Sequence, residues 1–346
     1  MDVRIASEND KEKWNQFVDR EGGSFFQYYD WKFIYEFKKQ RFLPLIINDS
    51  NSDITGIFPL VEQKGLIFPW LSSLPEGATG GYLLSNSLND DEKKMNIKMF
   101  FEFIDSNYSN THSLLTLKEQ IQFEGGSYEP SSILLENGYK FFNNTTIKLP
   151  CTHYLKLNIP FEEKIWNGIW SKRLRKRIRH VQKTGLQVIV DNELKYLENY
   201  ADMYCDSVKK FGVVAEKDDI YQLFTVFHNK IKLFIGLLDS QPISAALCFY
   251  TPTTAYLSKA PYLPVAGDYL TNTLPICTSI KYACDSSYKY YEMGITTTPD
   301  LAFHKEKFEA TRIPMRVYTK KFSQFKAITN KTFGYFRWGK KKLIGS

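Results

Sequence analysis

A dense run of cations at residues 171–183 holds the side chains best suited to chemistry in this sequence. The run contains seven lysines and arginines and no acidic residue. In a helix, Arg175 and Arg179 lie one turn apart on the same face, and a guanidinium group can bind phosphate through two parallel hydrogen bonds. We therefore expect this helix to bind the phosphates of a substrate or of tRNA. The candidate binding residues are Arg173, Arg175, Lys176, Arg179 and Lys183. The alternative is an amphipathic helix whose cations only face solvent.

A second basic segment ends the chain. The 37 residues after Glu309 contain ten lysines and arginines and no acid, although the net charge of the whole chain is only +7. Aromatic residues alternate with the last of these cations, a mixture suited to stacking on RNA or to the surface of an anionic membrane. These aromatic residues are Phe333, Tyr335, Phe336 and Trp338. The alternative is a packed terminal helix.

The composition is that of a folded protein. Of 346 residues, 43% are hydrophobic and 24% are charged, and this length predicts two domains. The sequence has no apolar run of ~18 residues and no apolar segment of a signal peptide near its start. The five cysteines form no CxxC pair, so we expect reduced thiols and a cytoplasmic location. The five histidines lack metal-ligand spacing, and we expect no metal site.

The elements that must position these candidates form two α/β halves that meet near residue 150. In the first half we expect strands at 42–48 and 54–62, and the hydrophobic periodicity of the second half predicts a longer series. In chain order it comprises a strand at 153–158, helices at 161–168 and 171–184, a strand at 186–190, helices at 193–210 and 217–228, strands at 231–238, 243–250 and 254–260, a helix at 269–285, a strand at 289–294, a helix at 300–309 and a strand at 314–321. We expect an α/β (α+β) fold with mostly antiparallel sheets flanked by helices.

Short motifs occur in a recognisable order along nearly the whole chain. They are Phe26-Gln27-x-x-x-Trp31, GIFPL at 56–60, Leu74-Pro75 with Gly80-Gly81, the basic segment from Trp170 to Leu186, PISAAL at 242–247, Asn272, YEMGIT at 291–296, and His304-Lys305-x-x-Phe308-x-Ala310. With these motifs the chain resembles the Fem family of peptidoglycan interpeptide-bridge aminoacyltransferases and their FemAB-like and BioF2-like acetyltransferase relatives.

This resemblance implies two tandem GNAT-like acyltransferase domains. We expect an N-terminal domain at 1–150, which the tail at 322–346 can complete, and a C-terminal domain at 151–321. The implied reaction is N-acyl transfer to an amine of a cell-envelope precursor, UDP-linked or lipid-linked, in peptidoglycan or polysaccharide synthesis. The donor would be aminoacyl-tRNA or acyl-CoA. No cofactor is required, because forming an amide from an ester or thioester is downhill.

The resemblance also implies roles for single residues. Lys305 would lie near the transferring acyl group, Glu292 would accept the proton of the amine, and Asn272 and Lys32 would contact substrate. The acyl donor of a GNAT-like domain lies between two diverging strands. The candidates that border this space are Tyr256 and Tyr262, and those at the place of the donor's phosphate loop are Gly267 and Asp268.

Two other functions fit the same sequence. One is an acyl-CoA-dependent N-acetyltransferase that acts on an amino sugar or a small amine. The other is a GNAT-like scaffold without activity that binds RNA or an anionic membrane through its basic segments.

Overall fold

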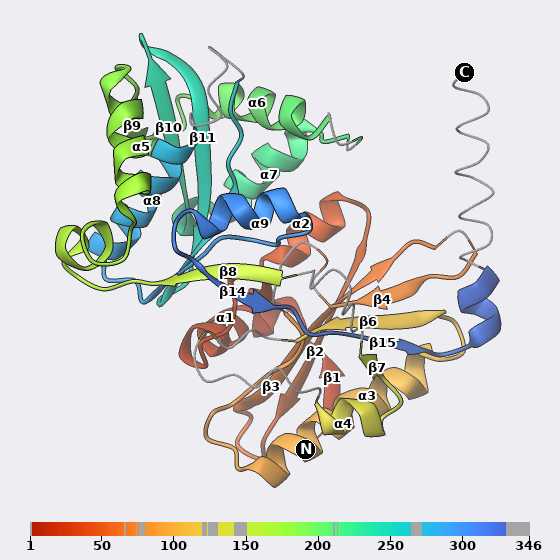
Figure 1. Ribbon diagram of the computed structural model, residues 1–346. Coiled ribbons are helices and arrows are strands. Elements are labelled where there is room, and N and C mark those ends of the chain that lie inside the picture. Colours follow the sequence, from red (N-terminus) through yellow and green to blue (C-terminus); the bar gives the residue numbers. More distant parts are fainter. Residues whose placement is uncertain are drawn as a thin grey trace, which may run out of the picture. The chain divides into compact units, whose positions relative to one another are not determined.

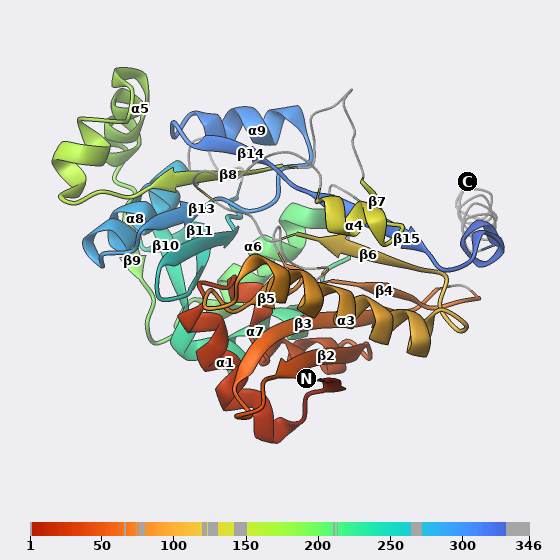
Figure 2. The same ribbon diagram turned by 90° about the horizontal axis from the view of Figure 1, so that it is seen from below.

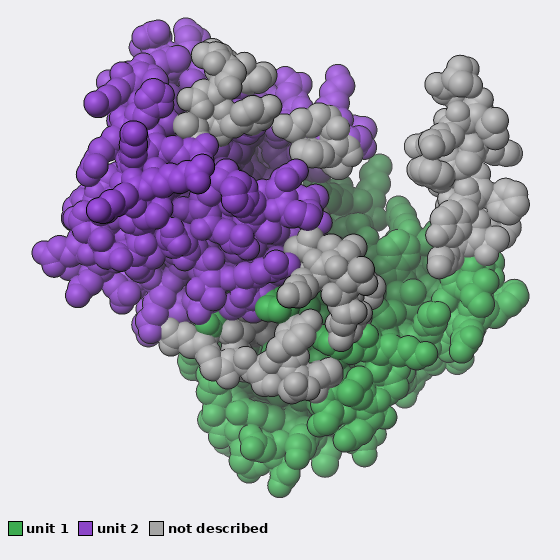
Figure 3. All heavy atoms as spheres, in the orientation of Figure 1, with its two compact units in different colours: residues 1–148, 314–346 green, residues 149–313 purple. Residues whose placement is uncertain are grey.

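The computed structural model describes residues 2–65, 67–73, 75, 80–119, 123, 131–141, 151–209, 212, 214–263 and 272–329. The chain folds as two compact units (Figure 3). Unit 1 comprises Met1–Lys148 and Pro314–Ser346, and unit 2 comprises Leu149–Ile313. None of the helices in the described ranges combines the length and the apolar character that crossing a bilayer requires.

Unit 1 is built on one mixed sheet with helices on both faces (Figures 1 and 2). Its strands are β1 (Val3–Ile5), β2 (Arg41–Asn48), β3 (Ile54–Gln63), β4 (Trp70–Ser72), β5 (Leu83–Leu84), β6 (Leu114–Lys118), β7 (Lys140–Phe141) and β15 (Val317–Lys321). Its helices are α1 (Lys11–Arg20), α2 (Trp31–Phe37), α3 (Asp90–Tyr108) and α4 (Ser132–Glu136), with 3-10 turns at Glu8–Asp10 and Phe25–Gln27. The strand order is β1-β2-β3-β4-β6-β15-β7, and β5 pairs with β3.

The helices of unit 1 form because their apolar residues recur at helical spacing. On α1, Trp14, Phe17 and Val18 lie at positions i, i+3 and i+4 and are buried. At the start of α3, the Asn89 side chain accepts the N–H groups of two first-turn residues, and Glu92 returns a bond to the Asn89 N–H, which forms a capping box. Because of these patterns, α3 and α4 pack on one face of the sheet and α1 and α2 on the other.

Unit 2 has a second mixed sheet, whose strands are β8 (Cys151–Lys156), β9 (Gln187–Val190), β10 (Ile231–Leu238), β11 (Gln241–Tyr250), β12 (Thr254–Lys259), β13 (Tyr290–Glu292) and β14 (Thr311–Pro314). Its helices are α5 (Lys172–Lys183), α6 (Leu197–Lys209), α7 (Lys217–Phe227), α8 (Thr273–Asp285) and α9 (Pro299–Glu306), with a π-helical turn at Glu162–Trp166 and a 3-10 turn at His228–Lys230. The strand order is β14-β8-β13-β12-β11-β10-β9.

Alternate residues of the central strand β11 face the two sides of the sheet in unit 2. On β11, Ala246 and Cys248 belong to the cluster that packs under α5 and α8, and the alternate residues Leu247 and Phe249 point to the opposite face of the sheet. Figure 1 shows α6 and α7 on that opposite face. The expected mixed α/β class with mostly antiparallel sheets is confirmed.

Each unit contains a pair of parallel strands with a helix between them in the chain. In unit 1, β4 and β6 are parallel and α3 connects them. In unit 2, β12 and β13 are parallel and α8 connects them. The two units therefore repeat the same central arrangement, as two tandem domains of one fold would.

The end of the parallel pair in unit 2 has two irregularities. The pairing of β12 with β13 stops at Tyr256 and Glu292, although β12 continues to Lys259. The register between β12 and β11 shifts at Ser258, which has no partner in the ladder, and such β-bulges redirect a strand. Beyond β13, Gly294 has a positive φ of 76°, and a Cβ atom there would lie 2.9 Å from the Leu257 carbonyl oxygen.

The predicted strand at 314–321 is wrong as a single element. The chain forms β14, which pairs with β8 in unit 2, and then β15, which lies between β6 and β7 in unit 1. The return to unit 1 therefore begins before residue 322. Its physical reason is that Tyr318 is fully buried in the core of unit 1, where its hydroxyl accepts the Ser131 N–H at 2.9 Å.

Candidate functional site

Helix α9 positions the lysine that the resemblance places near the acyl group. Thr298 caps this helix by accepting the Leu301 N–H at 3.3 Å, and Pro299 occupies the first helical position, where a missing N–H costs nothing. Lys305 follows on the last turn and is 4% exposed. The helix thus directs a cation into the interior of unit 2.

The Lys305 ammonium uses all three of its protons inside the protein. It donates to the Gly294 carbonyl at 2.6 Å, to the Ile295 carbonyl at 3.0 Å and to Thr296 Oγ1 at 2.9 Å. These three residues form the segment directly after β13. The cation therefore holds the backbone at the end of the parallel strand pair in one conformation.

Glu292, the other predicted catalytic residue, is buried at the end of β13. It is 1% exposed and accepts a hydrogen bond from the Thr152 hydroxyl on β8. Burial raises the pKa of Glu292, and the Thr152 hydrogen bond and the charge of Lys305 oppose this rise. Burial also lowers the pKa of Lys305 to about 8, against the attraction of Glu292. Both groups therefore titrate closer to neutral pH than usual, which is typical of functional sites.

Strand β8 supplies the remaining polar groups around Lys305. Cys151 exchanges backbone hydrogen bonds of 3.2 and 2.7 Å with Thr296, and His153 Nδ1 lies 3.1 Å from Thr296 Oγ1. Burial raises the pKa of the Cys151 thiol and lowers that of His153, whose Nε2 lies 3.5 Å from the Glu306 carboxylate. We call Lys305, Glu292, Thr152, His153 and Thr296 the buried polar cluster.

The predicted arginine pair of α5 packs against the π-helical turn that precedes it. Arg175 donates to the Trp166 carbonyl at 3.1 Å and to Asn167 Oδ1 at 2.8 Å. The Arg179 guanidinium lies over the Trp166 ring, 5.5 Å from its centre. Among the predicted cations, Arg175 is thus held by protein groups, whereas Lys176 and Lys183 are exposed.

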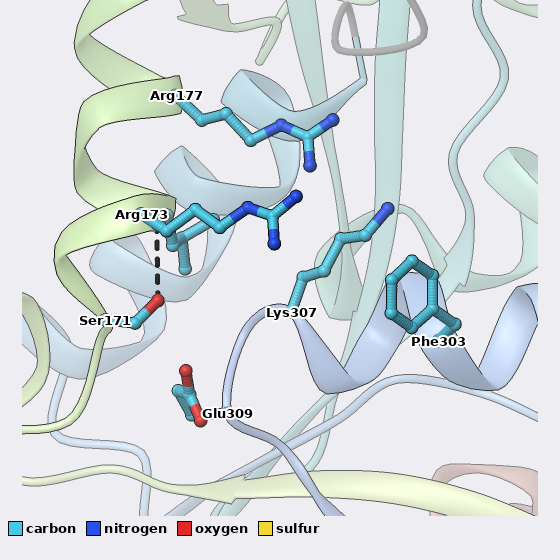
Figure 4. A pocket seen from close by; sticks show the side chains of 7 residues that line it. Ser171, Arg173, Arg177, Phe303, Lys307 and Glu309 are labelled. Atoms are coloured by element: carbon cyan, nitrogen blue, oxygen red, sulfur yellow. Dashed lines mark hydrogen bonds between the residues drawn. The ribbon is translucent and has the colours of Figure 1, made fainter.

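A basic hollow lies between α5 and the end of α9, and Figure 4 shows it from close by. It encloses about 170 Å³ and is lined by Ser171, Arg173, Leu174, Arg177, Phe303, Lys307 and Glu309. The ends of Arg173, Arg177 and Lys307 point into the same space, and Glu309 lies apart from them, below Ser171 (Figure 4). Of the predicted binding residues, this hollow includes only Arg173.

A second hollow of about 310 Å³ lies between the π-helical turn, α5 and α8. Its lining combines aromatic rings with cations: Phe161, Trp166, Trp170, Arg179 and Lys281. Arg179 therefore belongs to a different hollow from Arg173. The basic face that the sequence predicts as one clamp is divided between two sites.

The other predicted residues of unit 2 lie near the start of α8 and along β12. Asn272 is mostly buried at the start of α8, and its Nδ2 donates to the Ala260 carbonyl at 3.3 Å, which ties the helix to the end of β12. Tyr256 is 3% exposed and lies beside Glu292 in the parallel register. Tyr262 is half-buried and forms a bridge with Ser244.

Three predictions lie away from these residues or outside the described ranges. Lys32 belongs to unit 1, where it pairs with Glu8 and lies 3.8 Å from Glu36, so acidic side chains already bind it. Gly267 and Asp268 lie outside the described residues. So does the aromatic and basic end of the chain from residue 330.

Several residues of these sites were missed by the sequence predictions. Thr152 stands in none of the motifs, and Thr296 ends the YEMGIT motif without having been given a role. Only the pairing of distant strands brings Thr152 to Glu292, and only the packing of α9 brings Lys305 to Thr296. Thr152 therefore carries no sequence signal. Arg177 did carry one, since it stands four residues after Arg173 and therefore shares its helix face. Lys307 lies in the motif that contains Lys305, but its place in a basic hollow depends on the packing of α9 near α5.

The fold matches solved structures over almost the entire chain. FemX aligns with a TM-score of 0.71 at 13% identity, covering 93% of this chain and 97% of that one. A tandem GNAT protein from the clavulanic acid biosynthesis pathway gives a TM-score of 0.56 at 9% identity, with 93% and 98% covered. L-PGS from Bacillus licheniformis gives 0.56 at 14% identity, with 94% and 96% covered.

No family model and no curated protein matches the sequence. The likeness is therefore one of structure, and at these identities it concerns the fold. At that level the predicted resemblance to Fem proteins and the predicted tandem of GNAT-like domains are confirmed. The chain has the tandem GNAT-like fold, and this fold is similar to that of FemX.

Proposed function

We propose that this protein is an N-acyltransferase that moves an activated acyl or aminoacyl group to an amine of a phosphate-bearing cell-envelope precursor. The observation that carries the proposal is the position of the buried polar cluster in a tandem GNAT fold. The cluster lies at the end of β13, where the pairing with β12 stops. A GNAT-like domain holds its acyl donor between these two strands.

The reaction joins the amine nitrogen to the acyl carbon and breaks the ester or thioester bond of the donor. The amine loses one proton and the leaving oxygen or sulfur gains one. Much of the rate can come from holding the two reactants together, up to ~7–11 kcal/mol of the barrier in favourable cases. Glu292, whose pKa is raised by burial, is our candidate for accepting the proton of the amine.

Lys305 would act as a positioning residue through the peptide bond between Gly294 and Ile295. It binds the Gly294 carbonyl at 2.6 Å, and in a trans peptide the following N–H points in the opposite direction. Within the described part of the chain the Ile295 N–H has no acceptor. We assign this N–H the role of meeting the oxyanion that develops on the acyl group.

The test compares two glycines with the same type of backbone conformation. Gly294→Ala places a Cβ atom against the Leu257 carbonyl, whereas Gly185, with φ of 88°, has no atom within 4 Å of such a Cβ. Both variants pay the cost of a positive φ, ~1–3 kcal/mol, but only the first disturbs the end of the parallel pair. Amide formation is measured with aminoacyl-tRNA or acetyl-CoA as donor and a UDP-linked muropeptide or glucosamine as acceptor.

We expect Gly294→Ala to lose at least ~100-fold in turnover while it remains folded, and Gly185→Ala to keep most of its activity. The donor that supports turnover identifies the acyl carrier. A folded Gly294→Ala variant with wild-type turnover would refute the site. Failure of both donors with both acceptors would refute the function.

A further inference from the structure

The basic hollow carries more positive charge than the described residues around it neutralise. It contains three cations, Arg173, Arg177 and Lys307, and one carboxylate, Glu309. Among the described residues, none of these three cations has a carboxylate within 4.0 Å, in contrast to Lys32 of unit 1, which has two. The net charge of +2 thus faces a hollow that opens to solvent.

The cations are held close together even though they repel each other. Burial lowers the pKa of Lys307, and the charges of Arg177 and Arg173 lower it further. The Lys307 ammonium lies 4.5 Å from the centre of the Phe303 ring, a cation–π contact that keeps it in the hollow. An anion that binds between the three groups would relieve this repulsion.

The size and donor groups of the hollow suit a phosphate group. Its volume of about 170 Å³ is several times the roughly 30 Å³ that one water occupies in the liquid. Two guanidinium forks and one ammonium match a doubly charged, tetrahedral anion better than a single carboxylate. The hollow also lies beside the start of α5, whose positive end favours negative charge.

One wall of the hollow fits a group attached to the phosphate. Phe303 is 61% exposed at its rim, and in Figure 4 its ring lies beside the Lys307 side chain. An exposed aromatic ring next to cations is the arrangement with which proteins stack the base of a nucleotide.

We propose that Arg173, Arg177 and Lys307 form a binding site for the phosphate of a nucleotide-type ester, with Phe303 against the ring that the ester carries. The evidence for this site is the geometry and charge of the hollow. The proposal rests on the proposed function only where it asks which substrate carries the phosphate. It replaces the predicted clamp of Arg175 and Arg179 by two other arginines of the same helix, together with Lys307 at the end of α9.

The test measures binding to the full chain without any acyl donor, so that it does not depend on turnover. Adenosine diphosphate and inorganic phosphate are titrated by calorimetry into the wild type and into Arg177→Gln and Lys307→Gln. The matched control is Lys172→Gln, which removes one exposed charge from α5 outside the hollow. We expect each of the first two variants to bind adenosine diphosphate about tenfold more weakly, and Lys172→Gln to bind it within about twofold of wild type.

Two further variants define the ligand. Phe303→Ala is expected to lower the affinity for adenosine diphosphate severalfold and to leave the affinity for inorganic phosphate unchanged. Glu309→Gln is expected to raise the affinity for both ligands, because a carboxylate at the hollow repels an anion. A lower affinity in this variant would mean that the ligand carries a positive group beside its negative one, and would contradict our assignment. Equal weakening by Lys172→Gln and Lys307→Gln would show that the loss of affinity follows from overall charge and not from the hollow, and would contradict the proposal.

Two outcomes separate this proposal from the proposed function. If adenosine diphosphate and phosphate do not bind, or if only vesicles of phosphatidylglycerol bind, the phosphate site is wrong even when amide formation is observed. If adenosine diphosphate binds as expected but no donor supports amide formation, the phosphate site stands and the acyltransferase proposal fails.

Discussion

Two lysines at the end of α9 lie in opposite surroundings although they are two residues apart. Lys305 is 4% exposed and gives its three protons to the segment after β13. Lys307 faces the basic hollow with two arginines and an aromatic ring. Because successive residues of a helix are about 100° apart, positions i and i+2 point to opposite sides, so one short helix serves an interior and a surface.

A lysine side chain therefore stabilises the fold at position 305, whereas repulsion by neighbouring cations opposes its placement at position 307. The buried ammonium replaces its hydration with three protein acceptors, so its loss removes one charge-assisted hydrogen bond from each of them. The half-buried Lys307 ammonium gains a cation–π contact with Phe303, and the charges of Arg177 and Arg173 repel it. Replacing these two lysines by the same residue should therefore have effects of different size.

The largest effect is expected for Lys305→Met. The substitution keeps the length of the side chain but removes the ammonium that donates to the Gly294 and Ile295 carbonyls and to the Thr296 hydroxyl. The Gly294 carbonyl still accepts from Thr152 at 3.0 Å. We expect the free energy of unfolding to fall by about 3 kcal/mol, measured by urea denaturation. Lys307→Met is the matched control, and equal losses in the two variants would remove the distinction between the two lysines.

The next effect concerns His304, which stands between the two lysines in sequence. Burial, together with the charges of Lys307 and Lys305, lowers its pKa from 6.5 to about 4. The unfolded chain therefore binds a proton that the folded protein excludes between these pH values, and the folded state loses stability as the pH falls from about 6.5 to 4.

The full loss from His304 corresponds to roughly 3 kcal/mol. We expect His304→Gln to flatten the dependence of the melting temperature on pH below 6.5 relative to the wild type. A wild-type slope in His304→Gln would show that this histidine is accessible to protons in the folded state.

The smallest effect is expected in the basic hollow. Removing one of its cations relieves repulsion, so Arg177→Gln should leave stability unchanged or raise it by less than about 0.5 kcal/mol, most visibly at low salt. The measurement is urea denaturation at two salt concentrations. A clear loss of stability would mean that Arg177 is part of the packing of α5 and not a group kept for a ligand.

Local patterns allowed much of unit 2 to be predicted. The apolar residues Leu174, Ile178 and Val181 of α5 are buried as their spacing requires, and the meander β10-β11-β12 follows from its turns. Contacts between distant segments could not be predicted. The Thr152–Glu292 bond joins residues that are far apart in the chain, and it depends on β8 pairing with β13.

The candidate site could be predicted only in part, because local patterns indicate single residues but not their tertiary contacts. A motif singled out Lys305 and Glu292, yet no local pattern indicates that the lysine binds backbone carbonyls. The helix spacing of the arginines was correct, but two pairs at that spacing were available. Arg173 and Arg177 share the hollow with Lys307, whereas Arg175 is bound by the preceding turn, and only tertiary packing decides between the pairs.

The insertion of β15 between β6 and β7 has a consequence for synthesis on the ribosome. Unit 2 is continuous from Leu149 to Ile313, so all of its residues emerge before the strand that links β6 to β7 is made. In the sheet of unit 1, β6 and β7 lack the strand that joins them until residue 321 has left the exit tunnel. The half of the protein that is translated first is therefore the half that is completed last, and a nascent chain stalled before β15 would present the unpaired edges of β6 and β7 to chaperones.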